Sequence, residues 1–324
     1  MKALRAVCAL VVALGAAPAG MAQSYPSRPI TVVVPFSAGG PTDTLARIMS
    51  EPMRRVLGQT VVVDNTTGAG GTIATTRVVR AAPDGYLLVI GHWGTHVVNG
   101  AYYTLPFDVL NDFAPLAMIA SNPQMVISKP AVPAKNLKEL IAWIKANQDK
   151  VLIGTGGVGG ASHMAGIDFL NRIGVKLQFV PYRGAAPALQ ALLAGEIDIY
   201  VTQISSAVGQ VRSGKLRAYA VAAKNRQEAM PELPTVDEAG LPGFYTAVWH
   251  GIWAPKATPR DIVMKLNAAI VETLADPMVR QRFADLGQEI PPREQQTPEA
   301  LYAYQKAEIE KWWPLIRAAG LRAE

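Results

Sequence analysis

Short apolar runs alternate with amphipathic segments along this chain, and that alternation restricts its fold more than any other feature. Residues 30–34 form a β-branched run that is typical of a strand buried on both faces. Gly39 and Gly40 follow this run, and apolar residues then recur at helical spacing across residues 42–56. The same order of strand, glycine loop and helix recurs across residues 151–172. The pattern predicts an α/β fold with mostly parallel sheets.

Cap patterns and further apolar runs extend this prediction along the chain. Asn136, Thr258 and Thr297 have the pattern of helix N-caps, so residues 261–321 are expected to be mostly helical. Pro52 predicts a kink or an early end in the first helix, and residues 231–243 are typical of a long exposed connection. Further strands are expected at residues 60–63, 86–90, 178–180, 197–201 and 216–222.

The first residues have the three parts of a secretory signal peptide. Lys2 and Arg5 form a basic start, and residues 6–17 are small or apolar. This run, roughly a dozen residues long, is too short to span a bilayer comfortably. Gly20 and Ala22 then form a small-residue cleavage site. We therefore expect residues 1–22 to be a signal peptide cleaved after Ala22, and the mature protein to be exported.

The remaining chain is mildly basic and has no cysteine. The full chain has 31 Lys and Arg against 25 Asp and Glu; without Lys2 and Arg5 the counts are 29 and 25, a net charge of +4. This interspersed charge suits a small anionic ligand and lacks the basic stripe of a nucleic-acid-binding protein. The only cysteine, Cys8, lies in the signal segment, which excludes disulfides, cysteine metal ligands and a cysteine nucleophile. About 300 remaining residues favour two domains.

Two glycine-rich loops of one design are the main candidates for ligand binding. They span residues 35–43 and 154–163, and each lies between a predicted strand and a predicted helix start. Glycines let the backbone approach a ligand, and free N–H groups at a helix start attract an anion. Strand ends of parallel sheets are also common ligand sites. The loops therefore predict a clamp for a carboxylate; the alternative is that both are ordinary glycine-rich turns.

Patterns of dinucleotide-binding proteins and hydrolases are incomplete. Residues 154–159 match the glycine spacing of a dinucleotide site, but Arg183, rather than an acid, follows the next strand. Export also argues against a soluble nicotinamide cofactor. No G-x-S-x-G motif is present, and the adjacent Ser162 and His163 would point about 100° apart on a helix. We therefore expect no enzyme and no cofactor.

The histidines and single charged residues near the loops have several possible roles. His92 and His96 stand four apart but have no nearby acid before Asp108, so a pocket wall or a core position is favoured over a metal site. Arg183 either binds a ligand carboxylate or pairs with an acid across the cleft. Asp43 is explained as a favourable acid in the first turn of a helix. No metal is expected.

Several short motifs, in order and at matching spacing, resemble the substrate-binding proteins of tripartite tricarboxylate transporters, the Bug-type family of Gram-negative bacteria. The resemblance covers nearly all of the chain after the signal segment. The matching motifs are residues 25–29 (YPSRP), 35–43 (PFSAGGPTD), 82–86 (APDGY), 112–115 (DFAP), 180–184 (VPYRG), 214–217 (GKLR) and 234–243 (PTVDEAGLPG).

The resemblance implies a type II periplasmic-binding-protein, or Venus flytrap, architecture, in which a hinge of two crossings joins two Rossmann-like α/β lobes. Residues 24–122 plus 246–324 would form the first lobe, and residues 123–245 the second. It also implies a periplasmic location, a small carboxylate ligand in the interlobe cleft and delivery to a tripartite tricarboxylate-type membrane permease. We expect a monomer that binds no nucleic acid.

The glycine loops and the resemblance together predict the ligand site. The family commonly has Asp where this chain has Thr202, and small polar residues in place of His92 and Trp93. These differences predict a smaller or more aromatic carboxylate than citrate. A ligand sensor of the same fold that acts on a sensor kinase is an alternative, and so is an exported enzyme. The predicted ligand-binding residues are Phe36, Ser37, Gly39, Gly40, Thr42, Asp43, Gly70, His92, Trp93, Gly156, Gly159, Ser162, His163, Arg183, Thr202 and Gln203.

Overall fold

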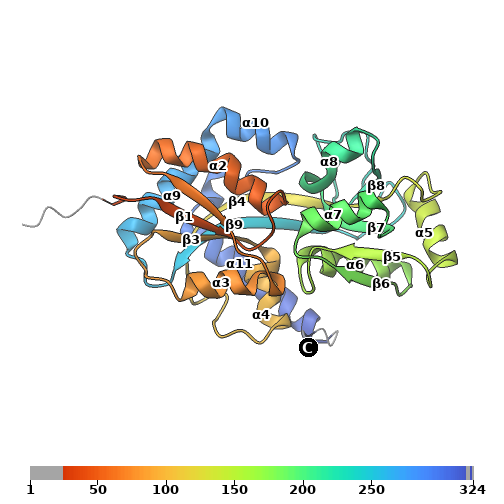
Figure 1. Ribbon diagram of the computed structural model, residues 1–324, viewed down its shortest axis with the longest axis horizontal. Helices are drawn as coiled ribbons and strands as arrows, with labels where there is room; N and C mark the ends of the chain where they lie inside the picture. Colours follow the sequence, from red (N-terminus) through yellow and green to blue (C-terminus); the bar gives the residue numbers. More distant parts are fainter. Residues whose placement is uncertain (1–24, 319–321, 323–324) are drawn as a thin grey trace, which may run out of the picture.

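The computed structural model describes residues 25–318 and residue 322, so the predicted signal peptide lies outside the described residues. The described chain forms a nine-stranded sheet in the order β2-β1-β3-β9-β4-β7-β5-β6, with β8 also paired to β4 (Figure 1). In this part of the chain, no helix is both long enough and apolar enough to cross a membrane.

The elements alternate along the chain as expected of an α/β fold. The strands are β1 (Ile30–Val34), β2 (Val61–Asn65), β3 (Leu87–His92), β4 (Phe113–Ser128), β5 (Leu152–Thr155), β6 (Gln178–Pro181), β7 (Ile199–Gln203), β8 (Arg217–Val221) and β9 (Ala247–Pro255). The helices are α2 (Pro41–Leu57), α3 (Thr72–Val79), α4 (Asn99–Tyr102), α5 (Leu137–Ala146), α6 (Ala161–Ile173), α7 (Ala185–Ala194), α8 (Ile204–Arg212), α9 (Arg260–Ala275), α10 (Pro277–Asp285) and α11 (Pro298–Ala318).

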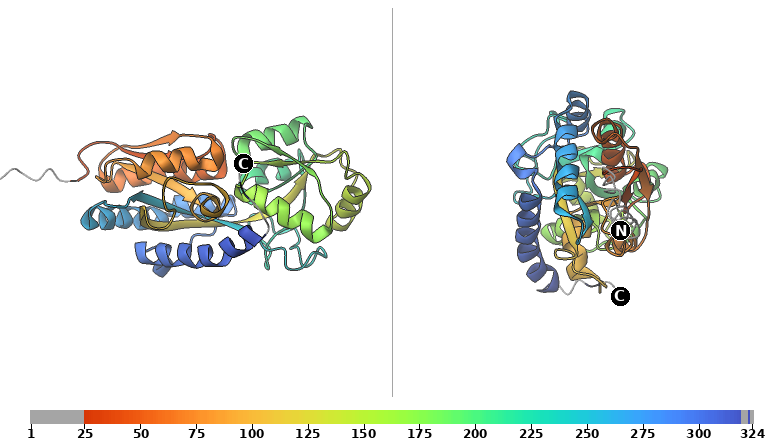
Figure 2. Two further views of the ribbon diagram at one scale, coloured as in Figure 1. Left: turned by 90° about the horizontal axis from the view of Figure 1, so that it is seen from below. Right: turned by 90° about the vertical axis from the view of Figure 1, so that its left-hand side faces the viewer.

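Two long strands, β4 and β9, join the two halves of the molecule. β9 pairs antiparallel with β3 and β4. Along β4 the partner changes: residues 113–123 pair with β9, and residues 124–128 pair with β7. We call the part with β1, β2, β3 and β9 the first half, and the part with β5 to β8 the second half (Figure 2). The lobe boundaries at residues 122/123 and 245/246 lie beside this change and stay a prediction.

Helices cover both faces of the sheet in each half (Figure 1). In the first half, α2, α9 and α10 enclose one apolar cluster, and α3, α4 and α11 enclose another around the fully buried Trp253. In the second half, α5 and α6 pack around Phe169, whereas α7 and α8 pack around Leu192. Because both faces are covered, strands such as β1 are mostly apolar, with Thr31 as its one polar residue.

Two of the three predicted caps are confirmed. Asn136 Oδ1 accepts the backbone N–H of Glu139 at 2.9 Å, and Thr297 Oγ1 accepts that of Ala300 at 3.1 Å. The cap at Thr258 is wrong by one residue, because Pro259 is the N-cap of α9 and the Thr258 hydroxyl donates to the carbonyl of Pro255.

Three other expectations need correction. The first helix does not end early at Pro52, since α2 continues to Leu57. The connection 231–243 is not exposed throughout, because Leu233 and Val236 are buried in it. The sheet is not mostly parallel: four strand pairs are parallel and four are antiparallel among the described strands. Here β4 and β9, which the sequence pattern missed, supply every antiparallel pair.

Candidate functional site

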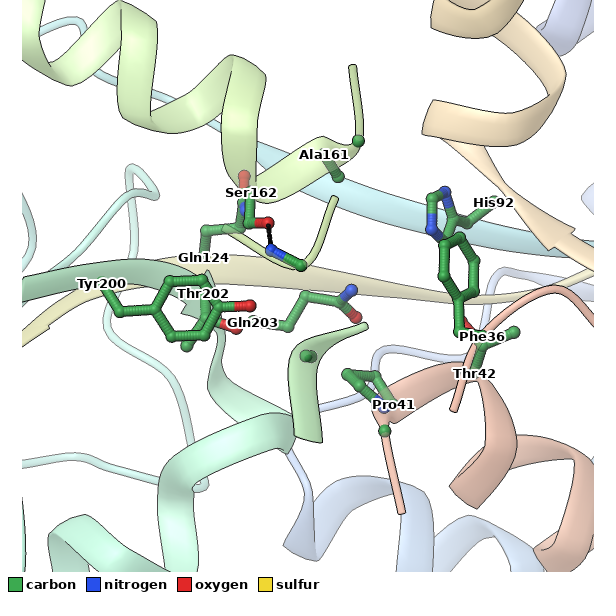
Figure 3. Close-up of a pocket in the computed structure, with 14 residues that line it drawn as sticks. Phe36, Pro41, Thr42, His92, Gln124, Ala161, Ser162, Tyr200, Thr202 and Gln203 are labelled. Carbon is green, nitrogen blue, oxygen red and sulfur yellow. Dashed lines mark hydrogen bonds between the residues drawn. The ribbon is translucent and has the colours of Figure 1, made fainter. Parts of the chain in front are cut away.

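A small cavity lies where the two halves meet, at the ends of β1, β3, β5 and β7 (Figure 3). Its volume is about 40 Å³. Both halves contribute to its wall, so the cavity depends on how they are placed relative to each other. The lining residues are Phe36, Gly40, Pro41, Thr42, His92, Gln124, Gly156, Gly160, Ala161, Ser162, Ala185, Tyr200, Thr202 and Gln203.

Three helix starts face this cavity, and none of them has a side-chain cap. The N-cap residues of α2, α6 and α7 are Gly40, Gly160 and Gly184, and no side chain accepts a hydrogen bond from their first-turn N–H groups. These helices have 17, 13 and 10 residues. The positive ends of their dipoles therefore converge, from both halves, on a space suited to an anion.

Strand β7 supplies polar groups from the second half. Side chains alternate along a strand, so Tyr200 and Thr202 lie on the same face of β7, and both line the cavity. The Thr202 hydroxyl donates to Ser206 Oγ at 3.1 Å. The buried Tyr200 hydroxyl interacts with the side chains of Thr202 and Ser162. Gln203 Oε1 is also buried and has no hydrogen-bond partner among the described residues. Buried polar atoms usually have partners, so this oxygen is available to a ligand.

The first half contributes an aromatic wall. The rings of Phe36 and His92 are stacked, with centroids 4.7 Å apart, and the edge of His250 meets His92 at 5.6 Å. Thr42 Oγ1 lies 3.2 Å from His250 Nε2. Burial lowers the pKa of His92 to about 4 and also lowers that of His250 well below its usual value. Both imidazoles are therefore neutral at pH 7.

Among the described residues, no lysine, arginine, aspartate or glutamate lines the cavity. Asp43, in the first turn of α2, accepts hydrogen bonds from the Gly39 N–H at 2.8 Å, from Arg47 at 2.9 Å and from Asn65 at 3.0 Å. Burial alone raises the pKa of Asp43, but these hydrogen bonds outweigh burial and lower it. Asp43 thus has the structural role predicted for it, and the cavity can hold an anion through neutral donors alone.

The two halves are in contact beside the cavity. Tyr103 Oη, in the first half, donates to the carbonyl of Val158 in the second half at 2.7 Å. At Gly184, with φ of 142°, an added Cβ would lie 2.4 Å from Ser37 Oγ across the interface. A side chain at position 184 would collide with Ser37, so the two halves approach each other closely at this point.

The predicted site residues fall into two groups. Those that line the cavity are Phe36, Gly40, Thr42, His92, Gly156, Ser162, Thr202 and Gln203. Those that do not line it are Ser37, Gly39, Asp43, Gly70, Trp93, Gly159, His163 and Arg183.

Three residues of the second group line other cavities. Gly70 and Arg183 line a neighbouring space of about 270 Å³. Arg183 is exposed and has no ion pair with a described residue, so the predicted pairing with an acid is not seen. Trp93 packs edge-on against Trp312 at 5.0 Å and lines a space of about 610 Å³ beside α6 and α11.

Ser162 and His163 hold the second glycine loop in place. Ser162 Oγ accepts the Gly156 N–H at 2.9 Å, and His163 Nδ1 accepts the Gly159 N–H at 3.0 Å. The two side chains bond to different glycines of the loop and not to each other. His96 is a core residue, stacked on Trp253 at 3.7 Å. Within residues 25–318 and 322, no three His, Cys, Asp or Glu side chains are grouped as metal ligands.

Sequence reasoning missed several lining residues. Gln124 lies on β4, which was not predicted, and Ala185 begins α7, whose start was not predicted from the sequence. Tyr200 could have been found, because it precedes Thr202 by two residues on a predicted strand. The alternation of side chains then places both on one face.

Comparisons with known proteins agree with this architecture. The model of the tripartite tricarboxylate transporter family receptor matches residues 45–321. A UPF0065 protein of Agrobacterium vitis, from the TAR-I ttuE-ttuC' intergenic region, is 39% identical over 298 residues, which cover 92% of this chain and 86% of that protein. The protein BugT of Bordetella pertussis is 33% identical over 325 residues, with 99% of each chain covered.

Solved structures give the same result. The periplasmic binding protein BugD superposes with a TM-score of 0.89 at 41% identity, covering 92% of this chain and 100% of that chain. MatC from Rhodopseudomonas palustris, with bound malate, gives 0.87 at 40% identity, with 90% and 100% covered. The predicted periplasmic-binding-protein fold is thereby confirmed, and the family consists of substrate-binding proteins rather than enzymes. The chain belongs to the tripartite tricarboxylate transporter receptor family and is of the Bug type.

Proposed function

We propose that this protein is a periplasmic receptor that encloses a small carboxylate between its two halves and delivers it to a tripartite tricarboxylate-type permease. One observation carries the proposal: uncapped helix starts from both halves converge on one cavity that no ionised side chain lines. In a water-poor space, N–H groups and helix dipoles bind an anion strongly without a counter-charge.

Closure follows from the same geometry. A ligand that contacts α2 in the first half and α6 and α7 in the second makes all of its contacts only when the halves are together. It therefore shifts the equilibrium toward the closed form in proportion to its better contacts there. Delivery to a permease is supported by the family, whose members are transporter receptors. The malate and adipate bound by two similar solved proteins support a carboxylate as the ligand class.

A thermal-shift screen tests ligand binding. The mature protein, refolded to remove carried ligand, is melted with mono-, di- and tricarboxylates, acidic amino acids, aromatic acids and nucleotides. A carboxylate at 100 times its Kd should stabilise the folded protein by about 2.7 kcal/mol. If no carboxylate raised the melting temperature, or if only a nucleotide did so, the result would contradict the proposal.

A glycine variant tests whether the ligand binds in the cavity. At Gly156, an added Cβ would lie 3.1 Å from backbone atoms of Gly184 and Ala185 and 3.3 Å from Tyr200 Oη. Gly156→Ala should therefore weaken the carboxylate-induced shift. Gly209→Ala is the matched control, because Gly209 is exposed on α8 with open space around its Cβ position. Equal carboxylate-induced thermal shifts in both variants would show that the ligand binds outside the cavity.

Transport and export need separate measurements. Deletion of the gene should abolish uptake of the ligand found in the screen, and the wild-type gene should restore it while the Gly156→Ala gene restores less. N-terminal sequencing of the exported protein should find its start after Ala22.

A further inference from the structure

His92 is held in one orientation at the wall of the cavity. Its Nδ1 accepts the backbone N–H of Gly94 at 2.8 Å. Its ring is stacked on Phe36, with an interplanar angle of 8°, and meets the edge of His250. An added Cβ at Gly94 would lie 2.7 Å from His92 Cε1 and 3.3 Å from the backbone nitrogen of Ala161. The His92 ring thus points across the interface toward the start of α6.

The hydrogen bond from Gly94 also fixes where the His92 proton lies. A neutral imidazole has one N–H, and a ring nitrogen that accepts a hydrogen bond does not carry it. The proton is therefore on Nε2. Only 5% of His92 is exposed, and burial lowers its pKa to about 4, so the ring keeps this single proton at neutral pH. No described residue hydrogen-bonds to Nε2.

Acceptors and donors for a ligand are placed on opposite sides of the cavity. Figure 3 shows the Phe36 and His92 rings facing each other on one side, across from Tyr200, Thr202 and Gln203. Gln203 Oε1 is a buried acceptor without a partner in the described chain. A ligand that satisfies the cavity therefore needs oxygens beyond its first carboxylate.

We propose that His92 is a specificity-determining residue, whose Nε2–H donates to an oxygen of a second polar group on a short dicarboxylate or hydroxydicarboxylate. The inference rests on the proposed function, because the first carboxylate is placed at the helix starts. A ligand hydroxyl would donate to Gln203 Oε1. A monocarboxylate with an apolar tail covers the Nε2–H and gives it no acceptor.

The expected discrimination is substantial. An unsatisfied buried donor weakens binding by about 10- to 100-fold, and sites built around a polar contact reject ligands that lack it. Titration calorimetry of the refolded protein should therefore find malate and succinate bound at least about 10-fold more tightly than butyrate.

Two substitutions separate the N–H of His92 from its ring. His92→Phe keeps the stack on Phe36 and removes the donor, whereas His92→Gln removes the ring and keeps an amide N–H near the position of Nε2. His92→Phe should lower the affinity for malate and succinate by about 10- to 100-fold and leave butyrate unchanged. His92→Gln should keep the preference for dicarboxylates. Tyr302→Phe, the control far from the cavity, should leave the ratio of malate to butyrate affinity unchanged.

A spectroscopic measurement tests the tautomer without a ligand. Long-range ¹H–¹⁵N spectra at pH 7 should show His92 as the neutral Nε2–H form, assigned by its loss in His92→Phe. An Nδ1–H form, or an unchanged malate-to-butyrate ratio in His92→Phe, would overturn the inference while carboxylate binding itself stands. If no carboxylate binds to the wild type, the proposed function fails as well.

Discussion

Lowering the pH from 7 to 5 should destabilise the protein, because three histidines are buried without charge. Burial lowers the pKa of His92 to about 4 and those of His96 and His250 well below the usual value. In the unfolded chain a histidine has a pKa of about 6.5. Between these values the unfolded chain binds more protons than the folded one, so the free energy of unfolding falls as the pH falls.

The size of this effect follows from the His92 value. Each unit of pKa difference corresponds to about 1.4 kcal/mol. A pH of 5 lies about 1.5 units below the pKa of His92 in the unfolded chain, where the ring is therefore protonated, while the folded ring is still neutral. His92 alone thus lowers the free energy of unfolding by about 2 kcal/mol relative to pH 7. His96 and His250 act in the same direction, and the total loss should exceed this figure.

Urea unfolding followed by circular dichroism at pH 7, 6 and 5 measures the loss. This window excludes Asp43, whose lowered pKa affects stability only as the pH falls below the unfolded carboxylate value of about 4. The variant His250→Phe should show a weaker dependence on pH, because one buried imidazole is gone. A free energy of unfolding that is flat or rises from pH 7 to pH 5 would refute the argument that these rings are buried neutral.

Two further substitutions test closure and the core. Tyr103→Phe removes the hydrogen bond to the Val158 carbonyl across the interface, which should weaken ligand binding by about 1 kcal/mol in titration calorimetry. The control Tyr302→Phe, far from the cavity, should leave the ligand affinity unchanged. Equal ligand affinities of the two variants would show that the contact between Tyr103 and Val158 does not stabilise the closed form. Phe169→Ala, in the core of the second half, should cost about 3–5 kcal/mol in urea unfolding, and a loss below about 1 kcal/mol would contradict tight packing there.

Local patterns predict much of this fold because most elements are short and regular. β1 was predicted with its observed bounds, and α6 ends at Ile173, one residue after the predicted end at residue 172. The long strands β4 and β9 were missed for a physical reason: β4 carries Pro115 and Pro123, which normally argue against a strand. Tertiary pairing with β9 and β7 overrides that preference, and no local pattern reveals it.

The site residues that were predicted correctly also belong to local sequence patterns. Gly40, Thr42, Gly156 and Ser162 belong to loops whose glycines are visible in the sequence, and all four line the cavity. Contributions that depend on how two distant segments meet were not visible. Trp93 follows His92 directly, yet it packs beside α11 in another cavity, because successive residues at the end of β3 point in different directions.

A crystal structure of the complex with the tightest ligand of the thermal-shift screen would show whether helix starts from both halves hold the carboxylate. We expect carboxylate oxygens within hydrogen-bond distance of backbone N–H groups at the starts of both α2 and α6. A ligand that contacts only one half, or that lies in the space beside α6 and α11, would contradict it.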